Sequence, residues 1–176
     1  MRELPAGIET RRVRGRDRAV VLEFVMAGIE SYRDWAPDWI PVPPSPELRE
    51  RLDGLYDDDE RAWALMALAD GEVVGLVSLA VTTGADTRVP DPGTVYLWQM
   101  FVRRDWQGSG LAGALMDRVL EEARRRGYRQ MVLWTPAGAA QARRFYEREG
   151  WELTGEQDPE SHFGLPLVQY ARATRP

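Results

Sequence analysis

The 176-residue sequence contains no cysteine, no lysine and no asparagine, and it has a single histidine, His162. Without cysteine the chain has no disulfide, no thiolate nucleophile and no ligand set for a zinc finger or an iron–sulfur cluster. One histidine also argues against a histidine-rich metal site and against a Ser-His-Asp triad. We therefore expect no metal site and no thiol chemistry.

The charge and hydropathy patterns exclude further classes of protein. The formal net charge is −5, whereas binding to nucleic-acid phosphates requires a basic face. The longest apolar run, residues 20–29, is interrupted by Glu23 and is shorter than the roughly 20 residues that span a bilayer. The arginine-rich start of the chain shows no secretory signal. We expect a cytoplasmic protein with no nucleic-acid or membrane partner.

Length and pattern indicate one domain that spans residues 1–176. A domain of about this size buries roughly 68 to 70% of the surface that its unfolded chain exposes, so a hydrophobic core is sufficient to hold it. The sequence has no internal repeat, and the short proline cluster within residues 41–46 comes too early to be a linker. Hydrophobic periodicity predicts the element order β-α-α-β-β-β-α-β-α-β-β.

The element boundaries follow from glycine, proline and capping signals. Asp70-Gly71 predicts a tight hairpin between strands 61–69 and 72–81. Residues 94–102 are apolar on both faces, which is typical of a covered central strand. The other predicted strands are 8–13, 130–135, 151–154 and 167–173. The predicted helices are one after Asp17 that ends before Pro37, a short one from Ser45, and 109–126 and 139–149, with a loop over 32–44.

A glycine-rich loop, residues 107–113, is the most informative motif. It follows the predicted central strand and begins a strongly amphipathic helix. Small residues let the backbone approach an anion closely, and the first turn of a helix presents unpaired N–H groups at the positive end of the helix dipole. The loop therefore predicts a pyrophosphate site; a tight turn that needs glycine only for its dihedral angles is the alternative.

Two nucleotide-like ligands fit such a loop. Gly108, Gly110 and Gly113 satisfy the G-x-G-x-x-G fingerprint of NAD-binding domains. That fingerprint requires an acidic residue about 20 positions on, to bind the ribose, but residues 133–136 are Leu-Trp-Thr-Pro. Too little chain also follows for a doubly wound domain, so the sequence disfavours an NAD-dependent oxidoreductase.

The second ligand is coenzyme A. Gln107-Gly108-Ser109-Gly110-Leu111-Ala112 resembles the acyl-CoA signature Q/R-x-x-G-x-G/A of the GCN5-related N-acetyltransferases (GNAT) at every defined position. A preceding Met100-Phe101-Val102 and a later Ala142-x-x-Phe145-Tyr146-x-x-x-Gly150-Trp151 follow in the family's order and approximate spacing. The resemblance is close over residues 73–151. It implies an α/β (mixed α+β) fold of three layers, with a central, mostly antiparallel, splayed β-sheet flanked by helices.

The resemblance also implies an acyl-CoA-dependent N-acyltransferase with acetyl-CoA as the acyl donor. Backbone groups of residues 100–102 would pair with the pantetheine arm, and backbone amides of the loop would hold the pyrophosphate, with Gln107 orienting the loop. Plain core packing is the alternative for the strand residues. The implied cofactor-binding residues are Met100, Phe101, Val102, Gln107, Gly108, Ser109, Gly110, Leu111, Ala112, Gly113, Ala142 and Phe145.

Acetyl transfer to an amine requires a proton donor for the departing thiolate. A thiol with a pKa of about 8.5 can be protonated by a phenol with a pKa near 10. Tyr146 stands where the resembled family has this acid, and packing of an aromatic ring is the alternative. The asparagine that the family often has three positions before Ala142 is Ala139 here, which removes one side-chain contact to pantetheine.

The sequence leaves the general base open. The carboxylates that some relatives use align near Tyr96 and Trp134, and neither is a useful base. The candidates are His162, Glu160, Asp34, Asp38 and a water relay through Gln99.

An aromatic and acidic segment predicts the acceptor site. Tyr32, Trp35, Trp39, Asp34 and Asp38 would attract a cationic amine by charge and cation–π contact, and packing of the rings over the core is the alternative. The predicted substrate-binding residues are Tyr32, Asp34, Trp35, Asp38 and Gln99.

The sequence thus predicts transfer of acetyl from acetyl-CoA to a primary amine of a small molecule, by direct attack in a ternary complex. A peptide N-terminus or a lysine side chain is the alternative acceptor. A non-catalytic acyl-CoA-binding module is the alternative of another class, because the base is unassigned and position 139 is alanine. An unpaired sheet edge at the final strands also suggests a homodimer.

Overall fold

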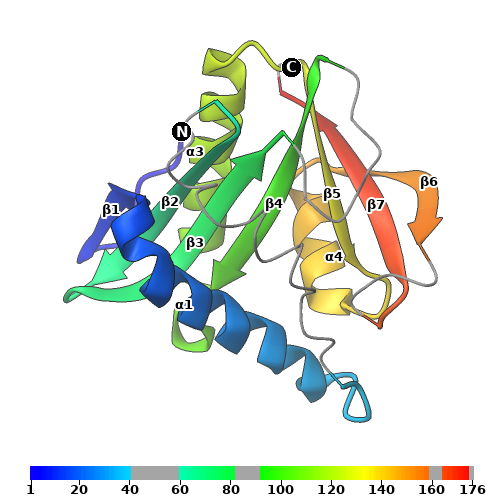
Figure 1. Cartoon of the computed structure of the whole chain (residues 1–176), viewed down its shortest axis with the longest axis horizontal. Helices are drawn as coiled ribbons and strands as arrows, with labels where there is room; N and C mark the ends of the chain where they lie inside the picture. Colours follow the sequence, from blue (N-terminus) through cyan, green and yellow to red (C-terminus); the bar gives the residue numbers. More distant parts are fainter. Residues whose placement is uncertain (41–59, 82–91, 159–163, 175–176) are drawn as a thin grey trace.

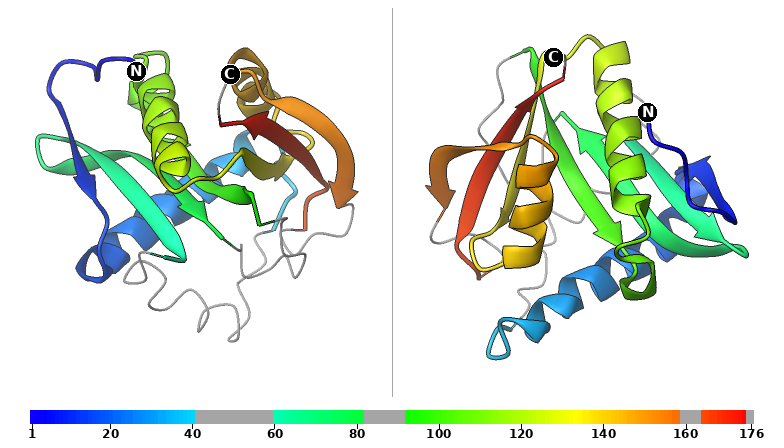
Figure 2. Two further views of the ribbon diagram at one scale, coloured as in Figure 1. Left: turned by 90° about the horizontal axis from the view of Figure 1, so that it is seen from above. Right: turned by 180° about the vertical axis from the view of Figure 1, so that it is seen from behind.

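A computed structural model describes residues 1–40, 60–81, 92–158 and 164–174. These residues form three layers, in which α1 covers one face of a seven-stranded sheet and α3 and α4 cover the other (Figures 1 and 2). The sheet is open, and five of its six strand pairings are antiparallel. The predicted three-layer fold with a mostly antiparallel central sheet is confirmed.

The strands lie in the order β1-β2-β3-β4-β5-β7-β6, which puts β4 in the middle as predicted. The strands are β1 (Ile8–Arg12), β2 (Ala62–Ala69), β3 (Glu72–Ala80), β4 (Thr94–Val102), β5 (Gln130–Pro136), β6 (Glu152–Asp158) and β7 (Leu167–Ala173). The α-helices are α1 (Arg18–Glu30), α3 (Leu111–Arg125) and α4 (Ala140–Arg148), and the 3₁₀ turns are η1 (Gly15–Asp17), η2 (Ser31–Asp34) and η4 (Arg104–Trp106).

The main core lies between the sheet and α3. Apolar residues recur at helical spacing along the inner face of α3, where Leu111, Leu115 and Val119 are fully buried. A second core forms under α1, where Val21 and Val25 are buried against the sheet. Burial on both faces is what makes the β2, β3 and β4 sequences almost continuously apolar.

The hairpin between β2 and β3 confirms the prediction from Asp70-Gly71. Both residues have positive φ angles, 49° and 82°, as the type I′ turn of a two-residue hairpin requires. The pairing runs from Ala69–Glu72 at the turn to Ala62–Ala80 at the far end.

Several boundaries differ from the prediction for physical reasons. α3 begins at Leu111 and not at Ser109, because Gly110 adopts a left-handed conformation (φ 91°) and is the N-cap. β6 continues to Asp158, beyond the predicted end at residue 154. The prediction stopped short because the side chains of β6 are almost all exposed and show no apolar alternation. The predicted loop 32–44 begins with the 3₁₀ turn η2, and the predicted helix from Ser45 lies outside the described residues.

Of the final strands, only β6 is an edge of the sheet. β7 pairs with β5 on one side and with β6 on the other. A second copy that extended this edge would therefore have to pair with β6. Among the described helices, none is long and apolar enough to cross a membrane.

Candidate active site

The central strand separates from β5 after three residue pairs. β4 and β5 run parallel and pair only at Thr94–Gln130, Val95–Met131 and Tyr96–Val132. At the point of separation β4 carries a bulge, because Ser78 and Leu79 of β3 pair with Gln99 and Leu97 and leave Trp98 between them. A bulge bends its strand and increases the local twist. The predicted splay of the sheet is confirmed, since the pairing of β4 with β5 ends at Tyr96–Val132.

Met100, Phe101 and Val102 lie on this separated part of β4. Their other edge pairs with β3, at Val77, Leu76 and Gly75. Phe101 packs against α1, while Met100 and Val102 pack against the core beneath α3. Their side chains thus serve the core, and the backbone edge that the sequence assigns to pantetheine faces the opening.

The glycine-rich loop lies at the N-terminus of α3, close to where β4 ends (Figure 1). Residues 107–110 are exposed, and Leu111 is buried as the first helical residue. The Ser109 hydroxyl donates to the Trp106 carbonyl oxygen at 2.7 Å and accepts from the Leu111 amide at 3.3 Å. An exposed loop that leads into a helix N-terminus in this way is suited to bind an anion.

Gln107 connects the loop to both sides of the opening. Its side-chain Nε2 donates to the Val102 carbonyl oxygen at 3.3 Å, and its Oε1 accepts from Nε2 of Gln141 on α4 at 3.0 Å. This geometry supports the predicted orienting role of Gln107. Gln141 is a partner that the sequence analysis missed, because no local pattern relates two glutamines that are 34 residues apart.

Gly113 differs from the exposed loop residues in its burial and in its neighbour. It is buried in the first turn of α3, and the guanidinium of Arg2 lies where a Cβ atom would be. Arg2 forms an ion pair with Glu149 at 2.7 Å and a longer one with Asp117 at 3.6 Å. The missing side chain at Gly113 therefore lets Arg2 lie across α3 toward the end of α4.

Tyr146 lies on α4 within an aromatic cluster. Its ring centroid is 5.6 Å from that of Phe145, 6.0 Å from Trp151 and 6.1 Å from Tyr170. Burial, with a smaller contribution from the phenolic group of Tyr32, raises the pKa of Tyr146 well above that of a free phenol. No side chain in the described part of the chain hydrogen-bonds to its hydroxyl. Ala142 and Phe145 are half-buried in the same core.

A network beneath Tyr146 fixes α4 to β7. Nε of Arg143 donates to the hydroxyl of Tyr170 at 3.0 Å, and that hydroxyl donates to Oε1 of Glu147 at 2.8 Å. Nη1 of Arg143 also donates to the Ala137 carbonyl oxygen at 3.0 Å, in the turn between β5 and α4. The sequence analysis missed this network, since its members lie on three different elements.

The predicted aromatic wall forms at η2. The ring centroid of Tyr32 is 5.5 Å from that of Trp35 and 5.7 Å from that of Trp39. Trp39 is buried, Trp35 is 38% exposed, and burial raises the pKa of Tyr32 to about 12. A Cβ atom at Gly138, in the turn before α4, would lie 2.8 Å from Cζ3 of Trp35, so the predicted acceptor wall lies against the start of the helix that carries Tyr146.

The remaining predicted acceptor and base residues differ in their exposure and in their partners. Asp34 and Asp38 are exposed, and Asp34 forms a 3.3 Å ion pair with Arg104. Gln99 accepts a hydrogen bond from the buried Ser78 hydroxyl at 3.2 Å. The two other base candidates, His162 and Glu160, lie outside the described residues. No group of three or more acidic or histidine side chains in the described ranges could hold a metal ion.

The sequence is similar to those of known acetyltransferases. The sequence profile of the Acetyltransferase (GNAT) family matches residues 29–151. N-acetylaspartate synthetase from Rattus norvegicus is 34% identical over 110 residues, which are 62% of this chain and 33% of that protein. Mycothiol acetyltransferase from Beutenbergia cavernae is 30% identical over 120 residues, 68% of this chain and 37% of that protein. The chain spans about a third of the length of these curated relatives.

A solved structure extends the comparison to the whole fold. The PaiA N-acetyltransferase from Thermoplasma acidophilum, in complex with coenzyme A, superposes with a TM-score of 0.68 at 14% sequence identity. The superposition covers 94% of this chain and 98% of that one. At this level of identity the likeness concerns the fold alone.

Proposed function

The chain belongs to the acetyltransferase (GNAT) family, whose members take acetyl-CoA as donor, and we propose that it acetylates a primary amine of a small molecule. The observation that carries the proposal is the separation of β4 from β5 beside the N-terminus of α3. An extended pantetheine arm can pair with the open edge of β4, while the first turn of α3 faces its pyrophosphate.

The proposed donor-binding residues are those that the sequence predicts. Residues 100–102 offer backbone groups, residues 107–113 offer amides, and the Gln107–Gln141 pair keeps the loop next to α4. Ala142 and Phe145 support the same side of the opening from α4. The substitution at Ala139 removes a side-chain contact and leaves these backbone contacts intact.

Tyr146 is the proposed general acid. The amine nitrogen attacks the thioester carbonyl carbon, the C–S bond breaks, and the sulfur takes the proton of the Tyr146 hydroxyl. Any phenol holds this proton at neutral pH, and the raised pKa of Tyr146 makes it a weaker acid toward the sulfur. The proton lost by the amine goes to a general base, for which the candidates are His162, Glu160, Asp38 and a water relay through Gln99. The ion pair of Asp34 with Arg104 makes it the weaker candidate.

The acceptor site is proposed to lie between η2 and the opening. Tyr32, Trp35, Asp38 and Gln99 would line it, and the clustered rings support recognition of a cationic amine. Two relatives are named for N-acetylaspartate and mycothiol and not for a protein substrate, which supports a small-molecule acceptor over a peptide or lysine. The single domain over 1–176, the cytoplasmic location and the homodimer stay predictions.

Ligand-dependent melting tests the donor site. A ligand at 100 times its Kd stabilises its protein by about 2.7 kcal/mol, which corresponds to a rise in Tm of about 5 to 10 °C for this size. We expect this rise with acetyl-CoA and none with NADH. Absence of the acetyl-CoA shift would refute the proposal.

Turnover tests the chemistry. In a screen of small amines, peptides and lysine derivatives, CoA release should follow a small amine. Tyr146→Phe should lower kcat by roughly 10²-fold or more while the KM for acetyl-CoA stays unchanged. Tyr128→Phe, a phenol at the other end of α3, is the matched control. Binding of acetyl-CoA without release of CoA for any amine would instead favour the non-catalytic module.

A further inference from the structure

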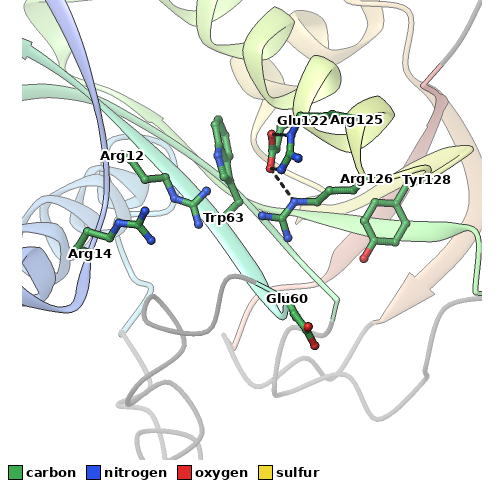
Figure 3. Close-up of a pocket in the computed structure, with 8 residues that line it drawn as sticks. All are labelled: Arg12, Arg14, Glu60, Trp63, Glu122, Arg125, Arg126 and Tyr128. Carbon is green, nitrogen blue, oxygen red and sulfur yellow. Dashed lines mark hydrogen bonds and ion pairs between the residues drawn. The ribbon is translucent and has the colours of Figure 1, made fainter.

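The two ends of α3 differ in how their charges are satisfied. At the C-terminal end, Glu122 accepts hydrogen bonds of 2.7 Å from Arg125 and Arg126 (Figure 3), and the basic residues of the last turn complement the negative end of the helix dipole. The first turn, residues 111–114, contains no acidic residue. The positive end of the dipole is thus open toward the loop, and the position of residues 107–110 affects how well an anion is held there.

This loop has glycine at two positions, and its backbone is little restricted there. Gly108 and Gly110 have φ angles of 81° and 91°, in the left-handed region that glycine adopts readily. A loop with such freedom loses conformational entropy when a ligand orders it, and that loss weakens binding. A contact that already holds the loop in the unliganded protein reduces this loss.

Gln141 provides such a contact from the other side of the opening. Its Nε2 donates to Oε1 of Gln107 at 3.0 Å, and Nε2 of Gln107 donates to the Val102 carbonyl oxygen at 3.3 Å. The Val102 carbonyl can only accept, so it fixes the orientation of the Gln107 amide, whose oxygen then requires a donor. Gln141 is that donor. The two bonds run from α4 through the loop to the end of β4, and they join both sides of the opening.

We propose that Gln141 is a positioning residue for acetyl-CoA, which acts through Gln107 to hold the glycine-rich loop in the form that binds the pyrophosphate. This inference rests on the proposed function and deepens it, because it names a residue that prepares the donor site without belonging to the motif. Both glutamine side chains are exposed, so the pair contributes little to the stability of the fold. Its effect should therefore appear in the affinity for the donor and not in Tm.

Calorimetric titration of the full chain with acetyl-CoA tests the proposal. Gln141→Met keeps the length and the neutrality of the side chain and removes its amide. We expect it to weaken acetyl-CoA binding about three- to tenfold, which is the usual contribution of one hydrogen bond. With the amine that the turnover screen identifies, the KM for acetyl-CoA should rise while kcat and Tm stay close to those of the wild type. Gln157→Met, at an exposed position on β6, is the matched control and should bind like the wild type.

A double-mutant cycle shows whether Gln141 acts through Gln107. In a Gln107→Met background, Gln141→Met should have almost no further effect on the affinity for acetyl-CoA. An unchanged or higher affinity of the single variant Gln141→Met, or an equal loss in both backgrounds, would overturn the proposal while the donor site itself stands. Failure of the wild type to bind acetyl-CoA would refute the proposed function, and this inference with it.

Discussion

Trp35 lies directly against Gly138, so that a Cβ atom at position 138 would be 2.8 Å from Cζ3 of the indole ring. Trp35 follows η2, and Gly138 belongs to the turn between β5 and α4. The contact therefore joins the segment after α1 to the far side of the opening between β4 and β5. It brings the predicted acceptor wall next to the helix that carries Tyr146.

Gly138→Ala should push the ring of Trp35 away from this turn. Overpacking of this kind costs about 1 to 3 kcal/mol. We expect a higher KM for the amine acceptor and little change in the KM for acetyl-CoA. The control is the same substitution in a Trp35→Leu background, where the clash is absent and the second change should have almost no effect. Equal effects in both backgrounds would mean that the contact has no role.

Gly110→Ala should weaken the start of α3. A non-glycine residue in the left-handed conformation costs roughly 1 to 2 kcal/mol, and φ at Gly110 is 91°. We expect a lower Tm and weaker binding of acetyl-CoA. Gly110→Asn is the matched variant, since asparagine tolerates this conformation better, and it should lose less of both. Equal stability of the alanine variant and the wild type would contradict the strain.

Acid should destabilise the protein partly through Asp17. Burial alone would raise its pKa, but the Arg14 amide and the Arg11 guanidinium donate to its carboxylate, each at 2.9 Å, and lower the pKa overall. Because the folded-state pKa lies below the unfolded one, this stabilisation is complete above the unfolded value, about 3.9. It is lost as the pH falls through the folded-state value.

Urea unfolding at pH 7 and pH 3 measures this effect. Asp17→Asn should be less stable than the wild type at pH 7, by about 1 to 3 kcal/mol, and the difference should shrink at pH 3. Asp38→Asn, at an exposed position, should stay within about 0.5 kcal/mol of the wild type at both pH values. A constant gap between Asp17→Asn and the wild type would exclude the linkage.

Arg143 should hold α4 in place beneath Tyr146. Arg143→Gln loses the bonds to the Tyr170 hydroxyl, which keeps Glu147 as a partner, and to the Ala137 carbonyl oxygen. We expect a loss of about 1 to 3 kcal/mol in the free energy of unfolding, measured in urea. Its neighbour Arg144 is exposed, so Arg144→Gln should stay within about 0.5 kcal/mol of the wild type.

The parts of the fold that sequence predicted are those with strong local signals. The bounds of β4 and β7 match the prediction, the hairpin forms at Asp70-Gly71, and the apolar stripe of α3 is buried as its periodicity required. The predicted end of β6 was wrong, because a strand that is exposed on both faces has no apolar pattern.

Side-chain partners were beyond reach where they join distant elements. Arg2 and Glu149 are separated by 147 positions, and Trp35 meets Gly138 across the opening. In the candidate site the loop and the β4 segment were predictable, since their motif is contiguous. The Gln107–Gln141 pair depends on how α4 is placed against the loop, and only the structure gives that placement.

The position of β7 has a consequence for synthesis of the chain. β7 lies between β5 and β6, although both of those strands precede it in sequence. β6 therefore has no strand to pair with until residues 167–173 have left the ribosome, and Tyr170 arrives beneath α4 at the same moment. A chain arrested before β7 would lose two strands of the sheet and the lower support of Tyr146, and it would leave the edge of β5 open to misassembly.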